Sequence, residues 1–289
     1  MLTPPKGLAW LQDSAGGRRW LSQLPVLVAE VAERWSLRVE EPFADASASL
    51  AMPATLPDGT RAVLKLAFPH RESRYEAEAL AEWDGDGAVR LLAHDPVRHG
   101  LLLERCILGS PLSELEADAA LSVFIQLLPR LWKPAGPPFP SLADEAGRWA
   151  RDLSERGESA ARPLPRALLD AALDALAFLR GTQGEQVLVN QDLHAGNVLR
   201  ARRQPWLVID PKPLVGEREF GIAAIVRGRE LGHSRDAVLR RLDRLTTELG
   251  LDRDRARAWA LAHTLAWSFE GDTVLTGLVE VAGWLLEGS

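Results

Sequence analysis

The apolar positions of this chain follow two different periods. Between Trp20 and Trp35 they recur every three or four residues, through Leu24, Val28 and Val31, which predicts an amphipathic helix. The preceding residues 1–17, rich in proline, glycine and small polar side chains, are expected to form a loosely held arm. Short apolar runs that favour strands follow at 37–42, 47–56, 61–67, 88–94 and 100–106.

The second part of the chain has mostly the helical period. Helices are expected at 116–132, 142–156, 165–180, 222–231, 236–249, 252–268 and 274–286. A further helix is expected at 70–83, among the strands. A strand-rich first part and a helix-rich second part predict an α+β chain of two lobes, 1–105 and 106–289.

Residues 187–213 carry the candidate chemistry. Asp192 follows an apolar run, Asn197 comes five positions later, and Asp210 ends a second apolar run, 206–209. A kinase supplies the groups for phosphoryl transfer as D-x-x-x-x-N followed by a separate metal-binding aspartate. The pattern predicts a hairpin with a polar turn at 200–205, Asp192 as the catalytic base, and Asn197 with Asp210 as Mg²⁺ ligands. The alternative is a surface hairpin whose aspartates only cap turns.

A lysine lies inside the apolar strand 61–67. Burying the ammonium of Lys65 costs free energy unless an anion accompanies it. In a kinase-like site the partners are the α- and β-phosphates of the nucleotide and a glutamate of the following helix. We favour Glu76 over Glu72 as that glutamate. An edge-strand lysine that points to solvent is the alternative.

The catalytic segment resembles the aminoglycoside phosphotransferase family, whose loop usually reads H-G-D-x-H-x-x-N. Positions that match the family pattern are Asp192, His194, Asn197 and Asp210. The usual His-Gly is replaced by Asn190-Gln191, and Asn190 lacks the ring that typically supports the loop. Residues 207–217 are closer still to the branch with streptomycin and hydroxyurea phosphotransferases. The resemblance implies a protein-kinase-like two-lobed fold, an antibiotic-resistance kinase, and the use of ATP and Mg²⁺.

The resemblance also assigns two nucleotide-contacting segments. The loop 43–49 stands where a nucleotide-covering loop would be; it has no glycine, but Ser47 or Ser49 could add a hydroxyl to the phosphates. An ordinary turn is equally compatible with this loop. The main chain around Glu104 and Cys106 stands at the hinge and is expected to pair with adenine.

Composition limits the classes of molecule that this chain is expected to bind. The 289 residues include 34 basic and 40 acidic side chains, a net charge of −6, which argues against nucleic-acid binding and suits a cationic small substrate. Cys106 is the single cysteine, so an internal disulfide is excluded and a reducing cytoplasm is expected. No signal peptide is predicted, and no apolar run reaches the roughly 18 residues that span a bilayer.

The favoured acceptor is the hydroxyl of a cationic, streptomycin-like aminoglycoside. Possible carboxylates for its site are Glu217, Glu219, Glu230, Glu270 and Asp272. A kinase for hydroxyurea or another metabolite is an alternative, and so is a nucleotide-binding pseudokinase, which Asn190 and the glycine-free loop suggest. No oligomeric state is predicted.

Overall fold

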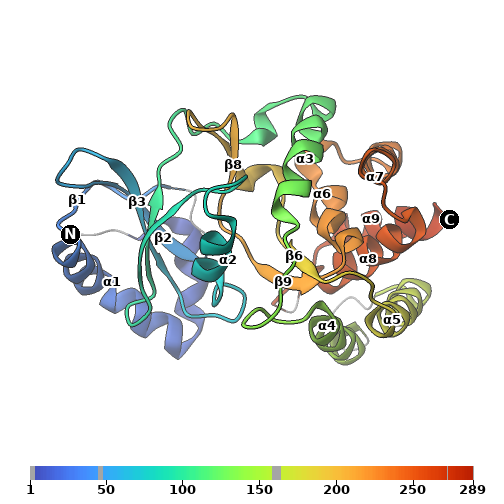
Figure 1. Cartoon of the computed structure of the whole chain (residues 1–289). Helices are drawn as coiled ribbons and strands as arrows, with labels where there is room; N and C mark the ends of the chain where they lie inside the picture. Colours follow the sequence, from blue (N-terminus) through green and yellow to red (C-terminus); the bar gives the residue numbers. More distant parts are fainter. Residues whose placement is uncertain (1–3, 45–47, 158–163, 272, 289) are drawn as a thin grey trace. The chain divides into compact units, whose positions relative to one another are not determined.

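The computed structural model describes residues 4–44, 48–157, 164–271 and 273–288 (Figure 1). The chain divides into two compact units. The first is Met1–Gly109 together with Ala201–Arg203, and the second is Ser110–Arg200 together with Gln204–Ser289. A functional boundary after Arg105 stays a prediction.

The first unit is built on an antiparallel sheet. Its strands are β1 (Arg38–Val39), β2 (Ser49–Thr55), β3 (Arg61–Ala67), β4 (Leu91–Asp95) and β5 (Gly100–Glu104), in the order β1-β2-β3-β5-β4. Gly59, with φ of 86°, makes the tight turn between β2 and β3, and the Asp58 carboxylate accepts a hydrogen bond from the Thr60 N–H at 2.8 Å. Asp-Gly between two apolar runs is a strong hairpin signal, and β2 and β3 form that hairpin.

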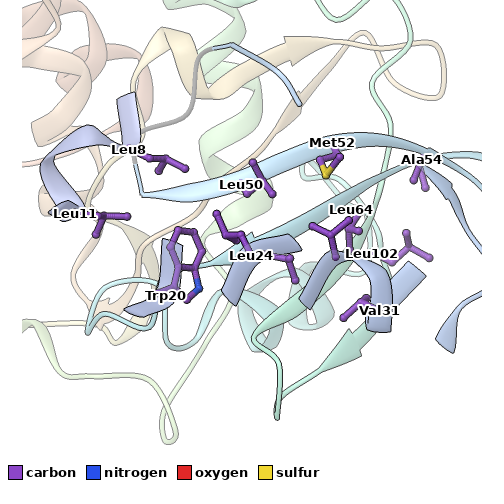
Figure 2. Packing of buried hydrophobic residues seen from close by; sticks show 13 residues of the cluster. Leu8, Leu11, Trp20, Leu24, Val31, Leu50, Met52, Ala54, Leu64 and Leu102 are labelled. Carbon is purple, nitrogen blue, oxygen red and sulfur yellow. The ribbon is translucent and has the colours of Figure 1, made fainter. Parts of the chain in front are cut away.

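The N-terminal segment packs against this sheet. Residues Lys6–Asp13 form a 3₁₀ helix, η1, and Ala15–Arg34 form helix α1. Figure 2 shows Leu8 and Leu11 of η1 in one cluster with Leu24 of α1 and Leu50 of β2. The loosely held arm expected from the sequence is wrong for residues 6–13. Leu8 and Leu11 are three residues apart, which is one turn of a 3₁₀ helix, so both side chains can be buried together.

Helix α2, Glu76–Trp83, is shorter than the 70–83 expected. Residues 71–75 form turns instead. The Ser73 hydroxyl donates to the carbonyls of Phe68 and His70, at 3.3 and 3.2 Å, and such side-chain bonds compete with the helical ladder. The helix therefore begins at Glu76, the glutamate predicted to pair with Lys65.

The second unit is mainly helical. Its helices are α3 (Ala117–Leu131), α4 (Leu142–Gly157), α5 (Arg166–Gly181), α6 (Ala223–Arg227), α7 (Arg235–Leu249), α8 (Arg253–Ala266) and α9 (Thr276–Glu287). Helix α8 packs against α4, α5, α6, α7 and α9. Asp252 caps the N-terminus of α8, and Gly250, with φ of 66°, ends α7. Within the described ranges, no helix has the length and apolar character needed to cross a bilayer.

Two small ladders carry the catalytic segment. Strand β7 (Val198–Arg200) pairs with β8 (Trp206–Val208), which confirms the predicted hairpin. Strand β6 (Val187–Asn190) pairs with β9 (Pro213–Gly216), a ladder that the sequence analysis did not predict. A third pair joins β10 (Phe269–Glu270) to β11 (Thr273–Val274). The remaining 3₁₀ segments are η2 (Leu112–Glu114), η3 (Ala195–Asn197), η4 (Arg218–Ile222) and η5 (Arg229–Leu231).

Candidate active site

The β6–β9 ladder fixes the backbone around Asp192. Asn190, 5% exposed at the end of β6, accepts hydrogen bonds on its side-chain oxygen from the N–H groups of Asp192 and Lys212, each at 3.0 Å. The Gln191 N–H donates to the Lys212 carbonyl at 3.0 Å. One buried carboxamide therefore holds Asp192 and Lys212 together. Asn190 supplies support where the family usually has a histidine.

The loop after Asp192 is held by two further contacts. The His194 ring accepts a hydrogen bond from the Gly196 N–H at 3.1 Å and caps η3, so this side chain supports the loop. The Ala195 N–H donates to a carboxylate oxygen of Glu230, in η5, at 3.0 Å. Glu230 was named from the sequence as a possible acceptor carboxylate; the structure gives it a contact that anchors the catalytic loop.

Asn197 and Asp210 lie at neighbouring ends of β7 and β8. The Asn197 amide donates to the Asp192 carbonyl at 3.2 Å, and the Asn197 carbonyl accepts from the Ile209 N–H at 2.9 Å. Asp210 follows β8 with φ of 50°, in the left-handed region that aspartate adopts more readily than most residues. Such a conformation is often kept at functional sites.

The donors of these two side chains fit Mg²⁺. An amide oxygen and a carboxylate are hard oxygen ligands, and Mg²⁺ is usually bound by one or two carboxylates together with substrate phosphates. Nowhere in the described part of the chain do three or more His, Cys, Asp or Glu side chains gather as a metal cage. Binding of Mg²⁺ by Asn197 and Asp210 together with nucleotide phosphates stays a prediction.

Two cations contact the Asp192 carboxylate. The Lys212 ammonium lies 2.7 Å from one oxygen, and a guanidinium nitrogen of Arg227, the last residue of α6, lies 3.7 Å from the other. The side chains of Lys212, Arg227 and Asp192 are 18%, 11% and 14% exposed, respectively. The sequence analysis missed both cations. Lys212 had a usable signal, since it follows the metal aspartate within Asp-Pro-Lys-Pro, whereas Arg227 had none.

Both cations lie over the indole of Trp267. The Lys212 ammonium is 5.1 Å and the Arg227 guanidinium carbon 4.5 Å from the ring centroid, within the range of cation–π attraction. The ring of His263 is fully buried, and its centroid lies 4.9 Å from the ring centroid of Trp267. Burial, followed by the charges of Arg227 and Lys212, holds the pKa of His263 well below its usual value. His263 is therefore neutral.

In the first unit, Lys65 of β3 is paired with Glu76 of α2. The ammonium lies 2.7 Å from both carboxylate oxygens, and the residues are 5% and 1% exposed. The contact chosen from the sequence is therefore present, and the solvent-facing alternative for Lys65 is wrong. The part of this pair in nucleotide binding stays a prediction.

The residues predicted to form the hinge include a carboxylate–arginine contact that the sequence analysis did not foresee. Arg203, which belongs to the first unit, donates to both oxygens of Glu104 at 2.8 Å. Partial burial acts to raise the pKa of Glu104, but its hydrogen bonds, chiefly those from Arg203, lower it overall. Burial and Glu104 raise the pKa of the Cys106 thiol to about 12. Adenine pairing by this main chain is untested.

The remaining predicted residues have different outcomes. Ser49 is the first residue of β2 and lies opposite Ala67, while Ser47 and Asp272 are outside the described residues. Glu217 is 2% exposed and accepts from the Arg255 guanidinium at 2.7 Å and from the Trp259 indole N–H. A buried carboxylate held in this way is structural, so the proposal that Glu217 lines an acceptor site is wrong.

A strand-rich unit with a buried lysine–glutamate pair and a helical unit with an Asp–Asn–Asp set define a protein-kinase-like phosphotransferase. Residues 34–270 match the family described as aminoglycoside/hydroxyurea antibiotic resistance kinase. The chain belongs to this family.

Two relatives support this class, and one solved structure supports the fold. It is 41% identical over 279 residues to streptomycin 6-kinase of Streptomyces griseus, covering 92% of this chain and 91% of the relative. It is 41% identical over 276 residues to hydroxyurea phosphotransferase of Kitasatospora aureofaciens, covering 93% and 80%. A thermostable mutant of aminoglycoside phosphotransferase APH(4)-Ia, in ternary complex with ADP and hygromycin B, has a TM-score of 0.61 at 16% identity and covers 90% and 95% of the two chains.

Proposed function

We propose that this kinase transfers the γ-phosphoryl group of ATP to a hydroxyl of a streptomycin-like aminoglycoside, in a Mg²⁺-dependent reaction in the cytoplasm. The observation that carries the proposal is the placement of Asp192, Asn197 and Asp210 around one loop that Asn190, His194 and Glu230 hold by hydrogen bonds. The similarity to streptomycin 6-kinase over nine-tenths of both chains supports this acceptor class.

Each group has a distinct role in this proposal. Asp192 orients the acceptor hydroxyl and takes its proton. Asn197 and Asp210 hold Mg²⁺, which neutralises charge on the nucleotide phosphates. Lys65, fixed by Glu76, holds the α- and β-phosphates, and the hydroxyl of Ser47 or Ser49 adds a contact to the phosphates. The main chain around Glu104 and Cys106 pairs with adenine.

Charge bears on the choice of acceptor. Lys212 and Arg227 place two positive charges at Asp192, so a cationic acceptor needs carboxylates that offset them. With Glu217 removed, the candidates in the described part of the chain are Glu219, Glu230 and Glu270. Of these, Glu230 and Glu270 are exposed.

Hydroxyurea is the second candidate acceptor. It is small and neutral, so two cations beside Asp192 would not repel it. The similarity to hydroxyurea phosphotransferase is as high, 41% identity, as that to streptomycin 6-kinase. A pseudokinase is disfavoured because Asn190, which suggested it, makes two hydrogen bonds that organise the loop.

The test is Mg²⁺-dependent ATP consumption by the purified chain against streptomycin, other aminoglycosides, hydroxyurea and simple aminocyclitols. We expect streptomycin to stimulate consumption and Asp192→Ala to abolish the stimulation. If hydroxyurea alone stimulates consumption, hydroxyurea becomes the proposed acceptor in place of streptomycin. Tight ATP binding without stimulated consumption by any acceptor would overturn the proposal in favour of a pseudokinase.

A further inference from the structure

Lys212 and Arg227 reach Asp192 from separate segments of the second unit. Lys212 lies between β8 and β9, and Arg227 ends α6, yet the two cationic groups contact opposite oxygens of one carboxylate. Both also lie over the same indole, that of Trp267. An aromatic face beneath two cationic groups limits the positions they can adopt.

The backbone beneath this cluster is also fixed. The Asn190 carboxamide oxygen accepts from the N–H groups of both Asp192 and Lys212, so one buried side chain restrains the backbone of both residues. Behind Trp267, neutral His263 lies in contact with Trp149 and Phe220, with ring centroids 5.1 Å apart in each case. The two cations therefore have a preorganised support, and the histidine adds no third positive charge to it.

The place of these cations has a chemical consequence. If Asp192 receives the acceptor hydroxyl, the γ-phosphorus must lie within bonding reach of that hydroxyl oxygen when transfer occurs. The non-bridging oxygens of the γ-phosphoryl group then come close to the groups that surround Asp192. Preorganised cations at that place stabilise the negative charge of the transition state.

We propose that Lys212 and Arg227 bind the γ-phosphoryl group of the donor and hold it through transfer; this inference rests on the proposed function. Their contacts shift from the Asp192 carboxylate to the non-bridging oxygens when the nucleotide binds. The acceptor oxygen forms its bond to the γ-phosphorus, and the bond to the β,γ-bridging oxygen breaks with its electron pair on ADP. The acceptor proton passes to Asp192, while Lys212 and Arg227 remain protonated.

A purely structural ion pair makes a different prediction. If Lys212 and Arg227 only restrained Asp192, their loss would impair turnover but would affect ATP and ADP binding alike. Cations that bind the γ-phosphoryl group instead favour ATP, because ADP lacks that group. The ratio of the ADP to the ATP dissociation constant therefore separates the two roles without relying on turnover.

The experiment is calorimetric titration of the full chain with ATP and with ADP, in Mg²⁺ and in EDTA. We expect Lys212→Met and Arg227→Met each to lower the ratio of the ADP to the ATP dissociation constant about tenfold or more, as for the loss of a charge-assisted hydrogen bond. Lys212→Arg should recover part of the ratio. Arg166→Met is the matched control, because Arg166 is an exposed cation at the start of α5 and should leave the ratio unchanged.

The outcomes are separable. If the parent binds ATP and phosphorylates an acceptor but both methionine variants keep the parental ratio, the inference is overturned and the proposed function stands. If the parent binds no ATP, the proposed function itself fails. Should Lys212→Met not fold, as judged by circular dichroism, Arg227→Met and Lys212→Arg decide the question.

Discussion

The buried pair Lys65–Glu76 gives a sharp test of how charge is accommodated in the first unit. The ammonium lies 2.7 Å from both carboxylate oxygens, and neither residue is more than 5% exposed. Glu76→Leu removes the carboxylate and leaves the ammonium in the interior. Breaking a buried ion pair in this way costs about 3–5 kcal/mol. For a chain of 289 residues, whose unfolding entropy is about 0.6 kcal/mol/K, the unfolding midpoint should fall by about 5–8 °C.

The double variant Lys65→Met/Glu76→Leu should behave differently. Replacing both charges with apolar side chains of similar size removes the desolvation penalty along with the attraction, so its stability should return close to that of the parent. A double-mutant cycle should therefore give a coupling free energy of about 2 kcal/mol or more. Both variants should lose ATP affinity, because the proposed phosphate-binding lysine is either unpaired or absent.

The assay is chemical and thermal unfolding of the four proteins of the cycle, with ATP affinity measured in parallel. A double variant no more stable than Glu76→Leu would refute the reasoning, since the cost would then come from lost packing and not from an uncompensated charge. Glu33→Leu, at an exposed position of α1 in the same unit, is the matched control and should change stability by less than about 0.5 kcal/mol.

Four further predictions concern other parts of the chain. Asp192→Ala should abolish phosphoryl transfer and retain ATP binding, whereas Asp210→Ala should weaken Mg²⁺-dependent ATP binding itself; calorimetry and a coupled assay separate them. Asn190→Ala should lower kcat about tenfold or more with folding retained by circular dichroism, because both N–H groups it binds lose their acceptor; an unchanged kcat would contradict this. Leu11→Ala should lower the free energy of unfolding in urea by about 2–4 kcal/mol, since Leu11 is fully buried. A decrease of less than about 0.5 kcal/mol would instead support the loosely held arm expected from the sequence. Cys106, whose pKa is raised to about 12, stays a neutral thiol at lower pH, so iodoacetamide should label it slowly even at about pH 9, where an ordinary thiol is largely ionised; rapid labelling would contradict the raised pKa.

Local pattern was enough for most of the elements. Asp58-Gly59 between two apolar runs specified the β2–β3 hairpin, and Asp252 after Gly250 specified the start of α8, because each signal lies within a few residues. Where the outcome depended on distant partners, the pattern failed. Leu8 and Leu11 are buried only because the sheet and α1 supply the other side of their cluster.

The site follows the same division. Asp192, Asn197 and Asp210 could be found from their order and spacing, and Lys65 from its apolar strand. Arg227 could not be found, because it is 35 residues from Asp192 in sequence and the contact depends on how α6 packs. The buried state of Glu217 was equally hidden, since its partner Arg255 lies on α8.

The most direct test of the account is transfer of radiolabelled γ-phosphate from ATP to streptomycin by the purified chain and by Asp192→Asn. The account predicts a Mg²⁺-dependent phosphorylated product with the parent and none with the variant, although both bind ATP. Equal product formation by Asp192→Asn would contradict the assignment of Asp192. A parent that binds ATP and modifies neither streptomycin nor hydroxyurea would contradict the proposed acceptors.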